Sequence, residues 1–166
     1  MKIVADKLAE WAVSERNEDN TDAFGRSAFN RYYYASYLIT REMLNGLDAS
    51  WTDTSHSNIP ELLEKAVINK IRKQLKQKEK TGLIPHVQAV RFRNTANTAV
   101  SELSNVLKLA YDVRVVADYQ PEIKIIREGR KVQLRHETLE GAKNWTKRVS
   151  QFTKSILKIW RQLGLS

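Results

Sequence analysis

The chain has 166 residues, of which 42% are hydrophobic and 28% charged, and these proportions are typical of one globular domain rather than of a disordered segment. Cysteine is absent, which excludes disulfide bonds and thiolate metal sites, and the net charge of +9 indicates a polyanionic partner. No apolar run approaches the roughly 20 residues of a membrane span, and the first residues lack the apolar stretch of a signal peptide. We therefore expect a single cytoplasmic domain over residues 1–166 that does not enter a membrane.

The helical spacing of apolar residues predicts three helices in the first half of the chain. The first covers roughly residues 2–16. The second covers about 21–45 and carries apolar and aromatic side chains on nearly all its sides, which is typical of a central helix. A loop over 48–58 follows, and a third helix begins near Ile59, with Pro60 well suited to its first turn.

Two more helices and a small hairpin follow. The fourth helix starts between Pro85 and Thr95 and ends near Asp118. The period then changes, and we expect two short strands around a glycine turn near residues 123–134. The last helix, about 138–163, keeps an apolar three-four spacing that is typical of packing in a bundle or a dimer. The predicted fold is therefore all-α, a bundle of about five helices with a small β-hairpin.

Positive charge is concentrated in one region. Residues 65–93 contain nine Lys or Arg and one acid, Glu79. This run is either a solvated helix face or a surface that binds nucleic acid, and both interpretations stay open. On the second interpretation, six residues are expected to bind RNA: Lys70, Arg72, Lys73, Lys76, Arg91 and Arg93.

Arg114 interrupts the apolar stripe of the fourth helix. Its spacing places it on one helix face with Leu107, Ala110 and Ala117. A charged side chain in an apolar stripe must be paired or directed at a ligand. Arg114 is therefore the first candidate for a functional residue.

Two residues that follow Arg114 belong to the same candidate site. Asp118 lies four residues further along the helix, at the spacing of an ion pair. Tyr119 closes the helix, and its hydroxyl is within reach of the same pocket. Two interpretations compete with a functional site: a structural ion pair, with a carboxylate of a neighbouring helix or with Asp118, and an apolar stripe that simply ends near the helix terminus.

Three motifs resemble those of HEPN domains. The segment Arg26-Ser-Ala-Phe-Asn-Arg-Tyr-Tyr-Tyr-Ala-Ser-Tyr37 is similar to the second helix of that family, and the pair His56-Ser57 also resembles it. The segment Arg114-Val-Val-Ala-Asp-Tyr119 is similar to a variant of the family's most characteristic motif. The resemblance covers roughly residues 4–121 and 138–162.

The resemblance implies a bundle of four or five helices that forms a homodimer. Many HEPN proteins are metal-independent ribonucleases of toxin–antitoxin or phage-defence systems, so RNA and an antitoxin or operon partner protein are the implied partners. Their site is an Arg followed four to six residues later by His. Arg114 matches that Arg, but the His position holds Tyr119. The implied roles are stabilisation of phosphate charge by Arg114 and handling or orienting of the proton by Asp118 with Tyr119.

Other arrangements are weaker. Arg130 and His136 also match an Arg-x-x-x-x-x-His pattern, but such matches arise by chance in a chain with 28 basic residues. No two His have the spacing of metal ligands, and there is no glycine-rich phosphate loop, so we expect neither a metal nor a cofactor. Two alternative functions stay open: a non-catalytic HEPN-like module that binds a protein or nucleotide, and a structural helical bundle.

Overall fold

The computed structural model describes residues 1–165. The structure is 78% helical, which confirms the predicted all-α class. No helix among the described residues is long and apolar enough to cross a membrane. The elements are α1 (Lys2–Ser14), α2 (Glu18–Leu47), η1 (Ala49–Trp51), η2 (His56–Asn58), α3 (Ile59–Leu62), the π-helical turn η3 (Leu63–Val67), α4 (Ile68–Lys80), α5 (His86–Tyr119), β1 (Ile126–Glu128), β2 (Lys131–Leu134), β3 (Glu137–Thr138) and α6 (Leu139–Gln162).

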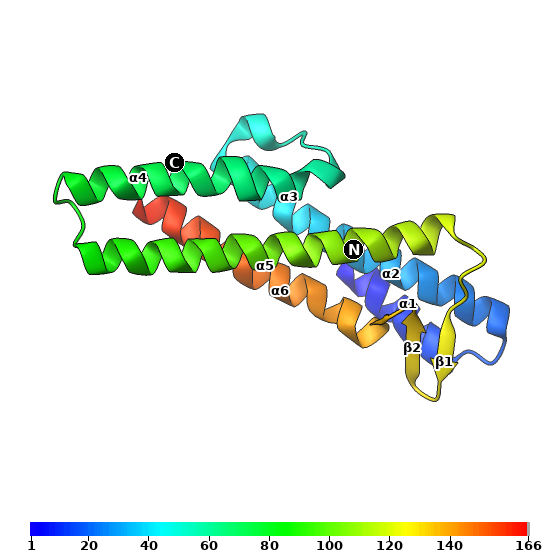
Figure 1. Cartoon of the computed structure of the whole chain (residues 1–166). Helices are drawn as coiled ribbons and strands as arrows, with labels where there is room; N and C mark the ends of the chain where they lie inside the picture. The colour runs from blue at the N-terminus through cyan, green and yellow to red at the C-terminus, as the bar shows by residue number, and fades with distance from the viewer. Residues whose placement is uncertain (166) are drawn as a thin grey trace. The chain divides into compact units, whose positions relative to one another are not determined.

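The described residues form two compact units. Unit one consists of residues 1–38 and 107–148, and unit two consists of residues 39–106 and of residue 149 onward. Helices α2, α5 and α6 each contribute one part to each unit (Figure 1). The expectation of a single domain over the whole chain stays a prediction.

Aromatic side chains of α2 form much of the core of unit one. Phe29 packs on Trp145 of α6 with ring centroids 6.3 Å apart, and Tyr33 packs on Tyr111 of α5 at 5.9 Å. Tyr32 is fully buried, and its hydroxyl donates a hydrogen bond to Asp6 Oδ1 of α1 at 2.9 Å. The second helix is therefore central in this unit, as its apolar surface predicts.

The predicted hairpin is present but differs in two respects. The sheet has three antiparallel strands in the order β1-β2-β3, and the short β3 was not predicted. The first strand begins at Ile126 rather than near residue 123. The link before it is bound to α2 instead, since Ile125 N donates to Asp22 Oδ1 at 2.8 Å. A Cβ on Gly25 would lie 3.0 Å from Ile125 Cδ1, so glycine lets the link approach this closely.

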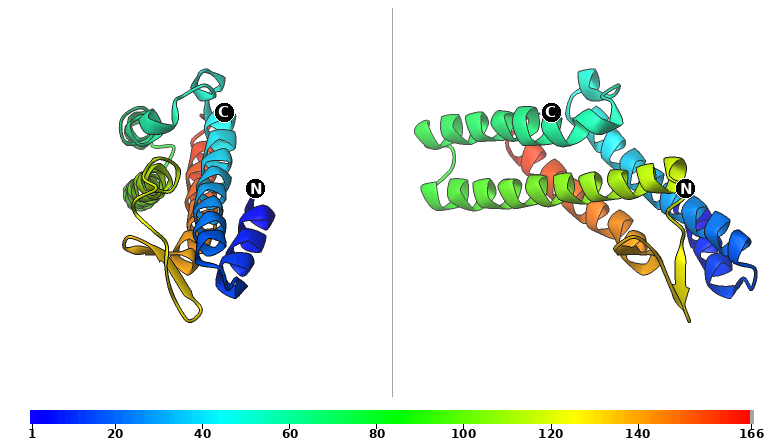
Figure 2. Two further views of the ribbon diagram at one scale, coloured as in Figure 1. Left: turned by 90° about the vertical axis from the view of Figure 1, so that its right-hand side faces the viewer. Right: turned by 45° about the vertical axis from the view of Figure 1, so that its right-hand side comes forward.

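Unit two contains an antiparallel helix pair, α4 and the first part of α5, which lie side by side in Figures 1 and 2. A turn with Gly82 at φ +72° joins them. Trp51 packs on Trp160 of α6 with centroids 6.0 Å apart, and Gln74 Nε2 donates to Leu163 O at 3.4 Å. The continuous stretch α3–η3–α4 confirms a third helix that begins at Ile59.

An ion pair in unit two predicts a pH-dependent stability. Asp48 Oδ2 lies 2.7 Å from Lys70 Nζ, and hydrogen bonds from Lys70 and then from Ser50 lower the pKa of Asp48 to about 2. A carboxyl whose pKa is lower in the folded state stabilises the fold above its unfolded pKa of about 4, and loses that contribution as pH falls through the folded value. The free energy of unfolding of wild type should exceed that of Asp48→Asn above about pH 4, and the difference should disappear towards pH 2.

Urea unfolding at several pH values measures this difference. Asp53→Asn is the matched control, because it removes one carboxylate from the same loop while Asp53 itself is 95% exposed. A difference between wild type and Asp48→Asn that stays constant from pH 5 to pH 2 contradicts the prediction.

Candidate functional site

Arg114 is held by other residues of unit one. Its side chain is 16% exposed, and its Nε lies 2.7 Å from Asp118 Oδ2, so the ion pair predicted from the spacing is present. Its Nη2 lies 3.5 Å from the hydroxyl of Tyr119, and its guanidinium lies 5.9 Å from the ring of Tyr34 and 5.2 Å from that of Tyr119. We call Arg114, Asp118, Tyr119, Tyr34 and Asn30 the Arg114 cluster.

The electrostatics of the Arg114 cluster keep the arginine charged. Burial disfavours the charge, but the carboxylate of Asp118 and the hydroxyl of Tyr119 outweigh it, so the pKa of Arg114 is raised above its ordinary value. The neighbouring Tyr33 is 2% exposed, and burial raises its pKa, so its phenol stays neutral. The cluster therefore holds a fixed arginine whose charge is partly balanced by Asp118, and an anion would bind through the guanidinium N–H groups that Asp118 and Tyr119 leave unused.

Asn30 fixes the carboxylate of Asp118. Its Nδ2 lies 2.8 Å from Oδ1 and 3.0 Å from Oδ2 of Asp118, and Oδ2 also faces Arg114. Both carboxylate oxygens are thus occupied by donors. This arrangement suits orienting Arg114 better than accepting a proton from a substrate, the other role that the resemblance implies for Asp118. Tyr119 is 67% exposed and remains accessible to a ligand.

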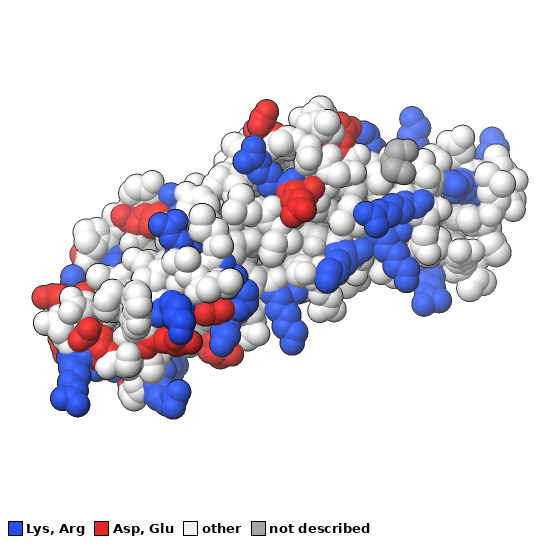
Figure 3. All heavy atoms as spheres, turned by 180° about the vertical axis from the view of Figure 1, so that it is seen from behind, with Lys and Arg blue, Asp and Glu red and all other residues white. Residues whose placement is uncertain are grey.

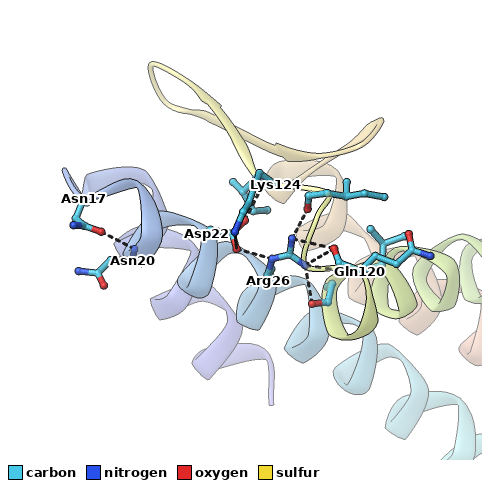
Figure 4. A network of polar contacts seen from close by, with 10 residues as sticks. Asn17, Asn20, Asp22, Arg26, Gln120 and Lys124 are labelled. Atoms are coloured by element: carbon cyan, nitrogen blue, oxygen red, sulfur yellow. Dashed lines mark hydrogen bonds and ion pairs between the residues drawn. The ribbon is translucent and has the colours of Figure 1, made fainter.

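Arg26 secures the helix end that carries Asp118 and Tyr119. Its guanidinium donates to the carbonyls of Val116, Ala117, Gln120 and Ile123, and its Nε donates to Asp22 Oδ2 at 2.7 Å. Figure 4 shows Arg26 between Asp22 and the end of α5. The last carbonyls of a helix have no partner within the helix, so Arg26 acts as a side-chain cap for α5.

The sequence did not predict the roles of Arg26, Asn30 and Tyr34. All three lie in the segment 26–37, whose pattern resembles HEPN domains, and that resemblance was the one sequence feature that pointed to them. Their partners on α5 lie 80 to 91 residues away in the chain. No local spacing rule connects positions that far apart.

A polar hollow of about 400 Å³ lies beside the Arg114 cluster. Its lining includes Arg26, Ser27, Asn30, Arg31 and Asp118, together with two alanines. The side chain of Arg31 is exposed and has no hydrogen bond or ion pair with another described residue. A hollow with this lining favours a polar, charged ligand over an apolar one.

Three of the six predicted RNA-binding residues have partners within unit two. Lys70 forms the ion pair described above. Arg72 Nη2 donates to Asn97 Oδ1 at 2.8 Å, and Arg93 Nη2 lies 3.6 Å from Glu79 Oε2. These contacts lie at the surface and leave each cation partly exposed, but each one restricts its side chain to a position beside a neighbouring residue.

The other three, Lys73, Lys76 and Arg91, are exposed and have no side-chain partner among the described residues. Figure 3, the view from behind, shows that Lys and Arg predominate over Asp and Glu on the right-hand side of the picture. Helix α6 adds basic residues that were not predicted, including Lys154 and Lys158, and it has no acid after Glu140.

Arg130 and His136 line different hollows. Arg130 lines one of about 1060 Å³, and His136 lines another of about 220 Å³. Among the described residues, no group of three or more His, Cys, Asp or Glu is placed to hold a metal ion. Arg130 and His136 are therefore a weaker candidate site than the Arg114 cluster, whose side chains contact one another.

Comparisons with protein-family models, with curated proteins and with solved structures found no match for this chain. What the protein does is therefore inferred from its own residues and from the motifs that resemble those of HEPN domains.

Proposed function

We propose that this is a HEPN-like protein that binds RNA, with the Arg114 cluster as the centre that contacts a backbone phosphate. One observation carries the proposal. Arg114 is nearly buried and is oriented by Asp118, yet its Nη1 has no acceptor among the described residues. Unused donors on a fixed guanidinium suit a phosphate, which accepts several charge-assisted hydrogen bonds. The homodimer and the toxin–antitoxin or phage-defence setting, with its partner protein, are proposed on the resemblance alone.

The reaction that such a site would serve is metal-independent RNA cleavage. The 2′-oxygen bonds to the adjacent phosphorus, the bond from phosphorus to the 5′-oxygen breaks, and a cyclic phosphate and a 5′-hydroxyl result. The 2′-hydroxyl loses one proton and the 5′-oxygen gains one. Arg114 would stabilise the charge that develops on the phosphate oxygens. Tyr119, exposed beside Arg114, is the group placed to orient or donate a proton.

A second candidate function is a non-catalytic module that binds a protein or a nucleotide. Two features favour it. Both oxygens of Asp118 are occupied by donors, and position 119 holds Tyr where the family has His. A tyrosine hydroxyl ordinarily ionises near pH 10 and is a poor proton acceptor at neutral pH. A site of this composition would bind an anion without cleaving it.

Incubation of the purified protein with end-labelled single-stranded RNA in excess EDTA tests the proposal. Fragments with cyclic phosphate ends establish cleavage. Binding without cleavage, measured by fluorescence anisotropy, leaves RNA as the ligand and assigns the protein to the non-catalytic class. If the protein neither binds nor cleaves the RNA at low salt, RNA is refuted as its partner.

RNA affinity should depend on salt and on the free lysines of α4. Each phosphate contact releases condensed counterions, so affinity should fall steeply between about 50 and 200 mM salt. The double variant Lys73→Glu with Lys76→Glu should weaken binding at 50 mM salt by at least about tenfold, because both cations are exposed and neither has a side-chain partner among residues 1–165. Anisotropy titrations of a labelled RNA measure both effects.

The matched control is Lys131→Glu with Lys147→Glu, which makes the same charge change at exposed positions of unit one. An equal loss of affinity in the two double variants would show that only the net charge matters. An unchanged affinity of the α4 variant would remove this helix from the RNA surface.

A further inference from the structure

A groove of about 670 Å³ runs along unit two, apart from the Arg114 cluster. One wall is Pro85 with the start of α5 as far as Thr95, and the other is the end of α6, from Ser155 to Gln162. At a rise of 1.5 Å per residue, the α5 wall is about 15 Å long. That length matches two to three turns of a helix laid in the groove.

The groove exposes apolar side chains that the fold leaves uncovered. Val87 on its α5 wall is 79% exposed, and Leu83, in the turn before that wall, is 70% exposed. Phe92 is half-buried in the lining, and Ile159 is buried beneath it. Burying exposed apolar area stabilises a complex by about 25 cal/mol per Å², so a partner with apolar side chains would gain from docking here.

The charges along the groove have one sign. Arg91 and Lys158 line it, and neither side chain has a hydrogen bond or an ion pair with another described residue. The lining contains no Asp or Glu. Beside it, Lys154 and Arg161 are exposed on α6, which has no acid after Glu140. The groove therefore combines apolar contacts along its floor with unpaired cations on both walls.

We propose that this groove binds an acidic amphipathic helix of a partner protein. Leu- or Ile-type side chains at i, i+3, i+4 and i+7 of the partner would enter the apolar lining, and its Glu or Asp would meet Arg91 and Lys158. RNA fits this surface less well, because its phosphates would meet Arg91 and Lys158 but would leave the exposed apolar side chain of Val87 without an apolar partner. The proposal is independent of the function assigned to the Arg114 cluster.

Fluorescence anisotropy with the full chain and a labelled designed peptide tests it. The probe is a 16-residue helix with Leu at i, i+3, i+4, i+7, i+8 and i+11 and mostly Glu elsewhere. A scrambled peptide of the same composition controls for charge alone. We expect the amphipathic peptide to bind at least about tenfold more tightly than the scrambled one. Equal binding of the two peptides overturns the proposal.

Two variants locate the contact. Val87→Asp changes an exposed residue and should weaken peptide binding at least about tenfold, as should Arg91→Glu with Lys158→Glu. Lys131→Glu with Lys147→Glu, in unit one, should leave the affinity within about threefold. The proposal fails if the groove variants bind as wild type does. It also fails if a single-stranded RNA of 16 nucleotides displaces the peptide and the groove variants lose RNA affinity instead, because the groove is then an RNA surface.

Discussion

Arg114→Ala should lower the rate of RNA cleavage by about 100-fold to 1,000-fold and leave the fold intact. Removal of one preorganised charge stabiliser from an active site has an effect of this size. The fold should survive because Asp118 retains both hydrogen bonds from Asn30, and the cap at the end of α5 comes from Arg26. Single-turnover cleavage of a labelled RNA in EDTA gives the rate, and circular dichroism checks the fold.

Two further variants separate charge from geometry at the same site. Arg114→Lys keeps the positive charge but removes the planar fork, so it should recover little of the rate. Tyr119→Phe keeps the ring 5.2 Å from the guanidinium and removes the hydroxyl. A rate close to that of wild type for Tyr119→Phe means that the phenol only positions the substrate. Equal activity of wild type and Arg114→Ala would place the site elsewhere, and Arg130 and His136 would be tested next.

Arg26→Ala should lower the free energy of unfolding by about 3 kcal/mol, the lower end of the cost of removing one partner from a buried ion pair, because this pair is part-buried. The side chains of Arg26 and Asp22 are 13% and 17% exposed. The substitution leaves Asp22 with a weakened set of donors and removes the cap from the last carbonyls of α5. Urea unfolding followed by circular dichroism gives the change directly.

Arg31→Ala is the matched control for Arg26→Ala. Arg31 lies on the same helix, is exposed and has no ion pair with a described residue, so its removal should change the free energy of unfolding by less than about 0.5 kcal/mol. Lys124→Ala provides a second control, since Lys124 Nζ lies 4.0 Å from Asp22 and its side chain is 66% exposed. A loss below about 1 kcal/mol for Arg26→Ala would mean that the cap contributes little to stability.

The long helices were predictable from the sequence because their apolar residues repeat at a period that needs no knowledge of partners. The observed bounds of α1, α2 and α6 lie within a few residues of the predicted ones. The end of the hairpin at Leu134 was also predicted correctly. Its predicted start was wrong because Ile123 and Ile125, although β-branched, are bound by Arg26 and Asp22 of α2.

The candidate site was predictable only within α5. A charge in an apolar stripe identifies Arg114, and a spacing of four identifies Asp118. The role of Asn30 was hidden, because an amide side chain on a helix has no spacing that indicates a carboxylate 88 residues later. The groove was hidden for the same reason, since its walls are the start of α5 and the end of α6.

Three helices belong to both compact units without a break in their helical backbone. Helix formation is cooperative, so a helix that loses its packing at one end also loses protection for the turns that follow. Opening of either unit should therefore destabilise the other through the shared backbone, and the chain should behave as one cooperative unit in native-state hydrogen exchange. The slowest amides are expected where each shared helix passes from one unit to the other, near residues 38, 106 and 148.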